Sequence, residues 1–361
     1  CISIFIASIN QKIGNIRDFK SIRFMRIFVK GFQDPTVFRF ATLDMVRGEW
    51  RKYLNSLIEP GMPMENSETT FDVSVVNLEE NGRRSPINYV LPPGIEREQI
   101  LGSTNVQQQN EQSISYRLCD LKNGDARGAF KNVTMDMRTY NKIKFFVHAE
   151  EKDPIYPLND GDLTMFIRLG SDYSANYYEY EMPLKVSPWN EHSSSSVWPE
   201  ANNMVINLNS LKQVKVTRNG AGLNVLERYT ELDPEDPSRN ITVIGNPNLQ
   251  GMKTIMIGIR NPKNDDPSNQ WQPDDGLEKC IEVWVNELRL SDFNENGGWA
   301  AIGRINANLA DFADVSFSGN YSTPGFGSIE KRVSERQQEF IYGVDASSTI
   351  RLGKFFGEKS G

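Results

Sequence analysis

The stretch GRINANLADFADVSFSGNY, residues 303–321, decides how the chain is interpreted. Its residues alternate between a series that is mostly apolar or glycine and a series that is mostly polar. A period of two residues is typical of a β-strand, whose side chains point alternately to opposite faces. Strands of soluble proteins are usually about 5–6 residues long. A strand of this length with a thin apolar face therefore needs an explanation.

The composition of the two series favours a strand with lipid on one side and water on the other. A soluble sheet buries its apolar face in a core rich in Val, Ile, Leu and Phe. Here Gly and Ala dilute the apolar series, whereas Asn, Ser and Arg dominate the polar one. A transmembrane β-barrel strand has this pattern. Trp299, Tyr321 and Phe326 lie near the ends of the pattern, where interfacial aromatic residues are expected.

A second segment, FIYGVDASSTIRLGKFF (340–356), repeats the alternation. We predict barrel-wall strands within residues 294–361, with a connection at 323–339 that begins as a turn and continues as a charged, helix-forming stretch. The residues predicted to face lipid are Ile305, Ala307, Leu309, Val315, Phe317, Tyr342 and Val344. The residues predicted to line the pore are Asn306, Asn308, Ser316, Ser318, Asn320, Ser347 and Thr349.

The length of the first segment leaves two interpretations open. A strand crosses a bilayer with about 9–11 residues. Residues 303–321 therefore form one strand that projects beyond the membrane, or two strands that meet near Asp311–Asp314. At that point we expect a bulge, a bend or the membrane boundary. The alternative is an edge hairpin of another soluble sandwich.

The chain before these strands divides into three regions. Residues 1–60 contain short apolar runs, and residues 61–70 form a polar linker. Residues 71–293 hold many short strand-like segments between turn residues, which indicates an antiparallel sandwich. The strand-like segments include FDVSVV, SISYRL, FKNVTMDM, KIKFFVHA, LTMFIRL, NYYEYEMPL, MVINL, ITVIG, MKTIMIGI and CIEVWVNELRL. One short helix with an Asn cap is expected at 207–215.

Two parts of the chain resemble each other. IGNIRDFKSIRFMRIF (13–28) is similar to IGNPNLQGMKTIMIGI (244–259), and a loop and a second strand follow each. We infer that residues 1–60 are the C-terminal part of a sandwich like that of residues 71–293. The order of elements in that sandwich resembles galactose-binding-like jelly rolls. The predicted fold is therefore all-β, with a jelly-roll-like sandwich between the tail of a similar one and transmembrane barrel strands.

Charge, hydropathy and cysteines exclude several classes of protein. The net charge of −7 argues against a general nucleic-acid binder, and no apolar run is long enough for a transmembrane helix. The chain begins at Cys1 without a signal-peptide pattern, so we interpret it as an internal fragment. Cys119 and Cys280 can pair in an oxidising compartment, but their spacing alone favours half-buried free thiols.

Candidate catalytic residues are few. His148 lies in a predicted strand, and His192 lies beside Ser193 in a serine-rich loop. Neither a nucleophile elbow nor a zinc-binding histidine pair is present in the sequence. We therefore expect no enzyme activity, metal or cofactor. An acidic hydrolase with a spatial pair of carboxylates stays as a minor hypothesis.

Two binding functions were weighed for the sandwich. Acidic turns at 159–162, 233–240 and 264–275 offer oxygen ligands for Ca²⁺, although solvated turns explain them better. A non-catalytic carbohydrate-binding sandwich of a surface protein is the alternative function. Its aromatic platforms would come from Trp189, Trp198, Trp271, Tyr173, Tyr177 and Tyr178, which are equally expected as core or rim residues.

Three long motifs resemble one known family. They are NELRLSDFNENGGWAAIGRINANLADFADVSFSGNYSTPGFGSIE (286–330), SIRFMRIFVKGF with RFATLDMVRGEWRKY (21–53) and INYVLPPGIEREQ (87–99). They are similar to the SprA/Sov family, the giant outer-membrane translocons of the type 9 secretion system in gliding Bacteroidetes. The resemblance covers essentially the whole chain. It implies a segment of a very large, laterally open β-barrel with inserted soluble domains, which exports folded proteins to the cell surface.

The resemblance also implies partners and a location. The partners are secreted cargo proteins with C-terminal sorting domains, a small barrel protein at the lateral opening, a periplasmic plug protein and membrane lipid. No nucleic acid is implied. The location is the outer membrane and cell surface, and the family has no catalytic motif to transfer to this sequence.

Overall fold

The computed structural model describes residues 30, 31, 33, 34, 37, 49–57, 68–97, 108–155, 157–263, 275–294, 297–331 and 335–355. The chain divides into two compact units, Cys1–Arg47 and Gly48–Gly361. Most of the predicted preceding sandwich tail, including the repeat at 13–28, lies outside the described residues.

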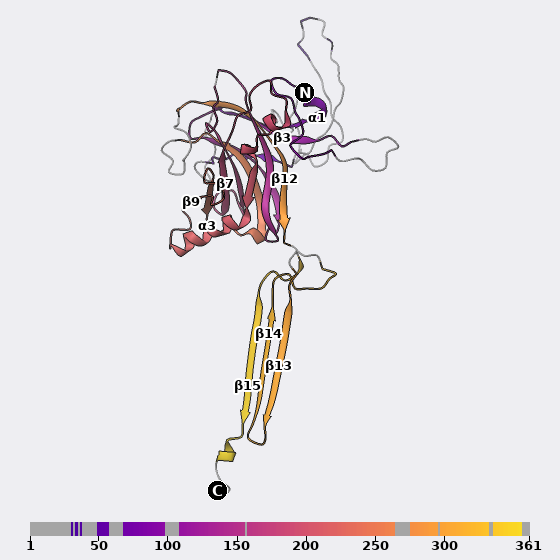
Figure 1. Cartoon of the computed structure of the whole chain (residues 1–361). Coiled ribbons are helices and arrows are strands. Elements are labelled where there is room, and N and C mark those ends of the chain that lie inside the picture. Colours follow the sequence, from indigo (N-terminus) through magenta and orange to yellow (C-terminus); the bar gives the residue numbers. More distant parts are fainter. Residues whose placement is uncertain are drawn as a thin grey trace. The chain divides into compact units, whose positions relative to one another are not determined.

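The described residues of the second unit form three antiparallel sheets (Figure 1). In spatial order, the seven-stranded sheet contains β1 (Arg51–Lys52), β4 (Ala126–Met135), β11 (Met252–Arg260), β6 (Thr164–Gly170), β7 (Tyr177–Pro183), β10 (Asn240–Ile244) and β9 (Tyr229–Leu232). The five-stranded sheet contains β2 (Thr70–Asn77), β3 (Gln112–Leu121), β12 (Lys279–Phe293), β5 (Tyr140–Glu151) and β8 (Met204–Asn207). The third sheet contains β13 (Ala300–Leu309), β14 (Ala313–Ser322) and β15 (Ile341–Ile350). The all-β prediction is confirmed, and each strand segment named from the sequence of 71–293 forms a strand.

Helices are short in the described part of the chain. The longest is α3 (Leu208–Gly220), which is capped by Asn207, whose side-chain oxygen accepts a 2.9 Å hydrogen bond from the backbone N–H of Asn209. The helix expected at 207–215 is therefore present and extends to Gly220. No helix among the described residues is long and apolar enough to cross a membrane. The other helical elements are α1 (Leu78–Asn81), α2 (Ser194–Val197), η1 (Glu200–Asn202), η2 (Leu249–Gly251) and η4 (Leu352–Phe355).

The two larger sheets pack around one hydrophobic core. The inner faces of β12, β5 and β3 meet the inner faces of β6, β7 and β11 in a single cluster of buried side chains. Ile281, Val283 and Val285 of β12 belong to this core. Trp284 points to the opposite face and joins a second cluster that includes Trp198. Side chains therefore alternate between the two faces along β12.

A disulfide joins Cys119 of β3 to Cys280 of β12. The expectation of two free thiols is wrong. Spacing along the chain gave no sign of the pairing, because 161 residues separate the two cysteines. They become neighbours only when β3 and β12 pair antiparallel.

The start of the described second unit adds a strand to the sandwich. Arg51 and Lys52, which we assigned to the preceding region, form β1 and pair with Phe130 and Ala129 of β4. Lys52 also donates a 2.5 Å hydrogen bond to the carbonyl oxygen of Phe71 and forms an ion pair with Asp72 at 3.1 Å. This short segment thus packs with the strands that follow it in the sequence.

The opening segment, residues 303–321, forms most of a hairpin. β13 ends at Leu309, β14 begins at Ala313, and a turn joins them, with Ala310 in the left-handed region at φ +51°. The interpretation as two strands is correct, and the expected bulge or bend is a tight turn. In the described part of 323–339, turns and backbone bonds from Gly325 and Phe326 to Gln337 replace the expected helix.

We predict that the Cys119–Cys280 disulfide stabilises the sandwich. Replacing both cysteines by Ser should lower the free energy of unfolding by about 2–4 kcal/mol, because the bond closes a long loop in the unfolded chain. Urea unfolding in detergent, followed by tryptophan fluorescence, measures the change. Cys1→Ser is the matched control and should leave the midpoint unchanged. An equal midpoint with and without reductant would contradict the prediction.

Candidate functional site

The sheet of β13, β14 and β15 has two chemically different faces. The strands pair directly opposite one another, with Ile305 opposite Phe317 and Phe317 opposite Ala346. Directly paired residues of neighbouring strands share a face of the sheet. The register therefore collects one apolar series and one polar series, which we call the apolar face and the polar face.

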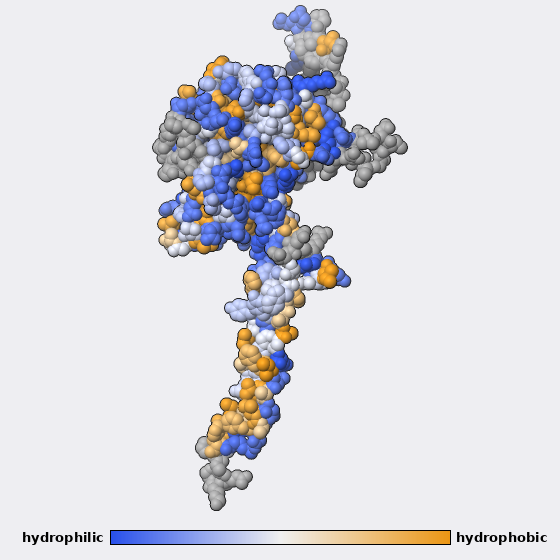
Figure 2. Space-filling view, in the orientation of Figure 1, coloured by the Kyte–Doolittle hydropathy of each residue, from blue (hydrophilic) through white to orange (hydrophobic). Residues whose placement is uncertain are grey.

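The apolar face contains each residue predicted to face lipid. The pairing places Ala307 opposite Val315, Leu309 opposite Ala313 and Val344 opposite Gly319. Most of these side chains are exposed, with Ile305 at 66% and Tyr342 at 78%. Val315 is half-buried, and Ala313 beside the turn is buried. Figure 2 shows apolar surface along β13–β15. Tyr321, which the prediction had placed at an interface, also lies on this face, opposite Tyr342.

The polar face contains each residue predicted to line a pore. Asn306, Ser316 and Ser347 form one row across the three strands, and Ser316 donates a 2.8 Å hydrogen bond to the side-chain oxygen of Asn306. In the next row, the Asn308 amide donates to Asp314 at 2.7 Å, and Thr349 lies opposite Asp314. These hydrogen bonds link short polar side chains of β13 and β14 across the polar face.

Three charged residues of the polar face were absent from our pore-lining set. Arg304 and Asp345 flank Ser318 in one row, and Asp314 lies between Asn308 and Thr349 in another. The period-two pattern places all three on the polar face, so the sequence did contain the signal. The set omitted them because we selected small neutral side chains.

The length and ends of the sheet fit a membrane wall. Each of the three strands is 10 residues long, within the range of about 9–11 that crosses a bilayer. At one end the rings of Trp299 and Tyr321 lie 5.1 Å apart, and Phe340 lies 6.4 Å from Tyr321. At the other end the rings of Phe312 and Phe355 lie 5.1 Å apart. Aromatic residues thus mark both ends of the sheet, as interfacial girdles do.

Ion pairs close the end of the sheet at the 310–312 turn. Arg351 pairs with Asp314 at 3.2 Å and donates to the carbonyl oxygen of Asp311 at 3.0 Å. Lys354 pairs with Asp311 at 2.6 Å. The Asp that interrupts the apolar series is therefore a turn residue with basic partners, which explains why it does not disturb either face.

Most aromatic side chains proposed for sugar binding are used in packing. Tyr177, Tyr178 and Trp198 are buried. Tyr173 packs against Tyr53 and Phe130. Trp189 is partly exposed, with its indole N–H donated to the carbonyl oxygen of Glu151, and Trp271 lies outside the described residues. Among the described candidates, these positions do not form a shared exposed platform.

The acidic turns are held together by their own hydrogen bonds. In 159–162, Asp162 accepts from the backbone N–H of Asn159 at 2.9 Å and pairs with Lys279 at 2.9 Å. In 233–240, Asp236 pairs with Arg239 at 2.7 Å. Most of the turn at 264–275 lies outside the described residues. Within the described residues, no group of three or more His, Cys, Asp or Glu side chains is arranged to hold a metal ion.

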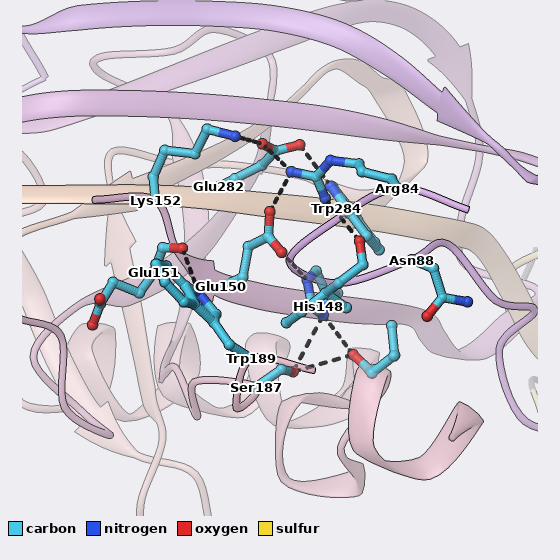
Figure 3. A network of polar contacts seen from close by, with 12 residues as sticks. Arg84, Asn88, His148, Glu150, Glu151, Lys152, Ser187, Trp189, Glu282 and Trp284 are labelled. Carbon is cyan, nitrogen blue, oxygen red and sulfur yellow. Dashed lines mark hydrogen bonds and ion pairs between the residues drawn. The ribbon is translucent and has the colours of Figure 1, made fainter. Parts of the chain in front are cut away.

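A buried ionic network covers the outer face of the five-stranded sheet (Figure 3). Glu150 of β5 and Glu282 of β12 are fully buried. The guanidinium of Arg84 forms ion pairs with both carboxylates, and its nitrogen lies 2.8 Å from an oxygen of Glu282. Lys152 also pairs with Glu282 at 3.0 Å. The Trp284 indole donates to Glu282 at 2.9 Å. These two carboxylates are thus neutralised within the protein, and neither is exposed to a substrate.

His148 lies beside this network on β5. It is fully buried and stacks on Trp284 with ring centroids 4.0 Å apart. Its Nδ1 lies 2.7 Å from the carbonyl oxygen of Val197, and its Nε2 faces Glu150 at 3.7 Å. The other histidine, His192, is exposed and bonds Asn88, whereas its neighbour Ser193 caps α2. His192 and Ser193 are thus engaged in separate contacts, whereas the hydroxyl of Ser187 lies 3.2 Å from Nδ1 of His148, with both residues buried.

The network controls the ionisation of Glu282. Burial disfavours the charged carboxylate, but Arg84, the Trp284 indole and Lys152 stabilise it and lower its pKa from 4.5 to about 2. A carboxylate whose pKa is lowered by folding contributes stability above its unfolded pKa, and that stability is lost as the pH falls through the folded pKa.

We predict that Glu282 makes the sandwich sensitive to acid between about pH 5 and pH 2. Glu282→Gln should lower the free energy of unfolding at pH 7, by up to roughly 3 kcal/mol, and flatten its decline below pH 5. Urea unfolding measured across this pH range tests both effects. Glu191→Gln, at an exposed carboxylate, is the control and should keep the wild-type slope. An unchanged slope in Glu282→Gln would contradict the prediction.

Comparison with known proteins adds the family. No curated protein matches the chain. The family model SprA_N, described as motility related/secretion protein, matches residues 2–361. This match covers almost the whole sequence, including the sandwich and the two-faced sheet. The chain belongs to the SprA_N family of motility related/secretion proteins.

Proposed function

We propose that this chain is a segment of an outer-membrane β-barrel translocon that exports folded proteins to the cell surface, as in type 9 secretion and gliding motility. In this proposal β13, β14 and β15 are strands of the barrel wall. The apolar face contacts lipid, and the polar face lines the conduit. The jelly-roll-like sandwich is a rigid domain inserted between wall strands.

One observation carries the proposal: three paired 10-residue strands form a sheet whose apolar face leaves large side chains such as Ile305, Phe317 and Val344 exposed. In water such a face is unfavourable, at about 25 cal/mol per Å² of apolar surface. Hydrocarbon removes this penalty, and a strand of this length matches the thickness of a bilayer. The family of motility and secretion proteins supports the same assignment.

The polar face suits a conduit for folded proteins. Asn306, Ser316 and Ser347 are short and neutral, and they offer a passing protein surface hydrogen-bonding groups rather than apolar ones. The exposed Ile302 and Ile341 of this face lie at its end near Trp299. Arg304 and Asp345 add both signs of charge to the same face. A lining of this kind favours passage without retention.

The disulfide supports a location outside the cytosol. Disulfides persist in oxidising compartments such as the periplasm and the cell surface, and Cys119–Cys280 joins a half-buried to a buried cysteine of the sandwich. The proposed partners are cargo proteins with C-terminal sorting domains, a small barrel protein at the lateral opening, a periplasmic plug protein and lipid. The chain acts without catalysis in this proposal, because it forms a wall.

We predict opposite labelling on the two faces of the sheet. Single cysteines at Ala307 and Phe317, introduced into the membrane-assembled protein with Cys1→Ser, should react with a lipid-phase maleimide. Cysteines at Asn306 and Ser318 should react with a water-soluble maleimide. Asn306 is adjacent to Ala307 and Ser318 is adjacent to Phe317 in the sequence. Each polar-face position is therefore the matched control for its apolar-face neighbour. Aqueous labelling at all four positions would exclude the lipid-facing assignment.

We also predict that charge is tolerated on one face alone. Phe317→Arg should reduce the amount of protein assembled in the membrane, because Arg facing lipid near the bilayer centre costs about 2–4 kcal/mol. Ser318→Arg, one residue away on the polar face, should assemble normally. Quantifying the protein in purified outer membranes compares the two. Equal loss in both variants would argue against a lipid-facing Phe317.

A further inference from the structure

The C-terminal end of α3 and the loop after it expose a group of apolar side chains. Leu226 is 76% exposed, and the group also includes Val216, Leu223 and Val225. We call these four residues the α3 tip. The corner of the sandwich at the end of α3 carries apolar surface in Figure 2. Apolar side chains gathered on one exposed loop mark a contact surface.

The α3 tip is held firmly by the sandwich. Arg218, the last basic residue of α3, is fully buried, and its guanidinium donates to the carbonyl oxygens of Gly245 at 2.8 Å and Val225 at 3.5 Å. The N–H of Gly245 in turn donates to the carbonyl oxygen of Val225 at 2.7 Å. The buried arginine thus fixes a loop whose apolar side chains point outward, so their exposure is part of the folded structure.

The helix α3 is basic in an acidic protein. The chain carries a net charge of −7. The helix nevertheless contains no Asp or Glu, and its lysines are the exposed Lys212 and the half-buried Lys215. Glu227, which follows the tip, accepts a 2.9 Å hydrogen bond from the side chain of Asn224. Lys212 is exposed beside the tip. Apolar side chains with basic neighbours are the combination that binds anionic lipid surfaces.

The helix that carries the α3 tip begins at the end of the sandwich from which the chain leaves for β13. Asn207, which caps α3, pairs with Lys142 of β5, and Lys142 pairs with Ser291 near the end of β12. β12 ends at Phe293 and β13 begins at Ala300. Six residues lie between them, so this connection is no longer than about 25 Å when fully extended.

We propose that the α3 tip inserts into the lipid surface beside the barrel wall and anchors the sandwich to the membrane. This inference rests on the proposed function, since the bilayer is reached through β13. Trp299 directly precedes β13, at the end of that strand that follows the sandwich in the sequence, and its ring lies 5.1 Å from that of Tyr321. These aromatic residues and the α3 tip would contact the same leaflet. Val216, Leu223, Val225 and Leu226 enter its apolar layer, and Lys212 contacts anionic headgroups.

Site-specific labelling in native membranes tests the inference. Single cysteines replace Leu226, Ile155 and Phe317 in the Cys1→Ser protein, and each is treated with lipid-phase and water-soluble maleimides. Ile155 is the matched control, because it is 79% exposed and follows β5 at the opposite end of the sandwich. We expect the ratio of lipid-phase to aqueous labelling at Leu226 to exceed that at Ile155 by at least about tenfold, as for a leucine transferred from water to lipid.

The outcomes at the three positions separate the inference from the proposed function. Equal ratios at Leu226 and Ile155, with Phe317 in lipid, overturn the tip contact and leave the wall assignment standing. Aqueous labelling of Phe317 overturns the wall assignment, and the tip contact with it. Protection of Leu226 from both reagents shows that a protein covers the tip, which also overturns the lipid contact.

A charge variant tests the role of the headgroups. Lys212→Glu should lower the lipid-phase labelling of Leu226 at least about fivefold, because each basic residue near an anionic surface adds to the attraction. Labelling of Phe317 in the same variant should be unchanged. Unchanged labelling of Leu226 in Lys212→Glu would contradict the role of anionic headgroups.

Discussion

The pairing of β12 with β3 and β5 is the interaction on which the rest of the sandwich depends. β12 pairs with β3 from Lys279 to Val285 and with β5 from Ile281 to Phe293. Because side chains alternate along the strand, Val283 enters the core while Glu282 and Trp284 organise the ionic network on the other face. The same strand carries one half of the disulfide and ends where the chain leaves for β13. One strand therefore links the core, the buried charges and the connection to β13.

The sandwich and the three-stranded sheet are suited to different solvents. The sandwich removes even charged groups from water, and Glu150 and Glu282 remain stable there because Arg84 binds both. The sheet of β13–β15 does the opposite and leaves side chains such as Ile305 and Tyr342 exposed. A protein that folds in water alone has no reason to combine these two arrangements in one chain. The proposed function, in which the chain meets both water and lipid, accounts for both.

The sequence predicted the faces of the strands better than their ends. Leu309 pairs with Ala313, so three residues form the turn between them. Because the paired residues Leu309 and Ala313 both have odd numbers, odd-numbered residues lie on the same face of both strands. The period-two pattern therefore continues through the turn. The two faces could therefore be predicted outright, whereas the turn was predicted only as one of two alternatives. The contacts of Arg84 with Glu150 and Glu282 span 66 and 198 residues. No local pattern encodes them, and the same holds for the disulfide.

The edges of the three-stranded sheet determine what its apolar face requires. Within the described residues, β13 and β15 each pair with β14 alone. Backbone groups on an open edge need hydrogen-bonding partners, and hydrocarbon supplies none. Transfer of the sheet into a bilayer is thus favourable for its apolar face and unfavourable for its two unpaired edges. The sheet is stable in a bilayer only when further strands pair with both edges. In the proposed function, the sheet is therefore one section of a continuous wall rather than an independent membrane anchor, and the sandwich is joined to it through β12 and the short connection that follows.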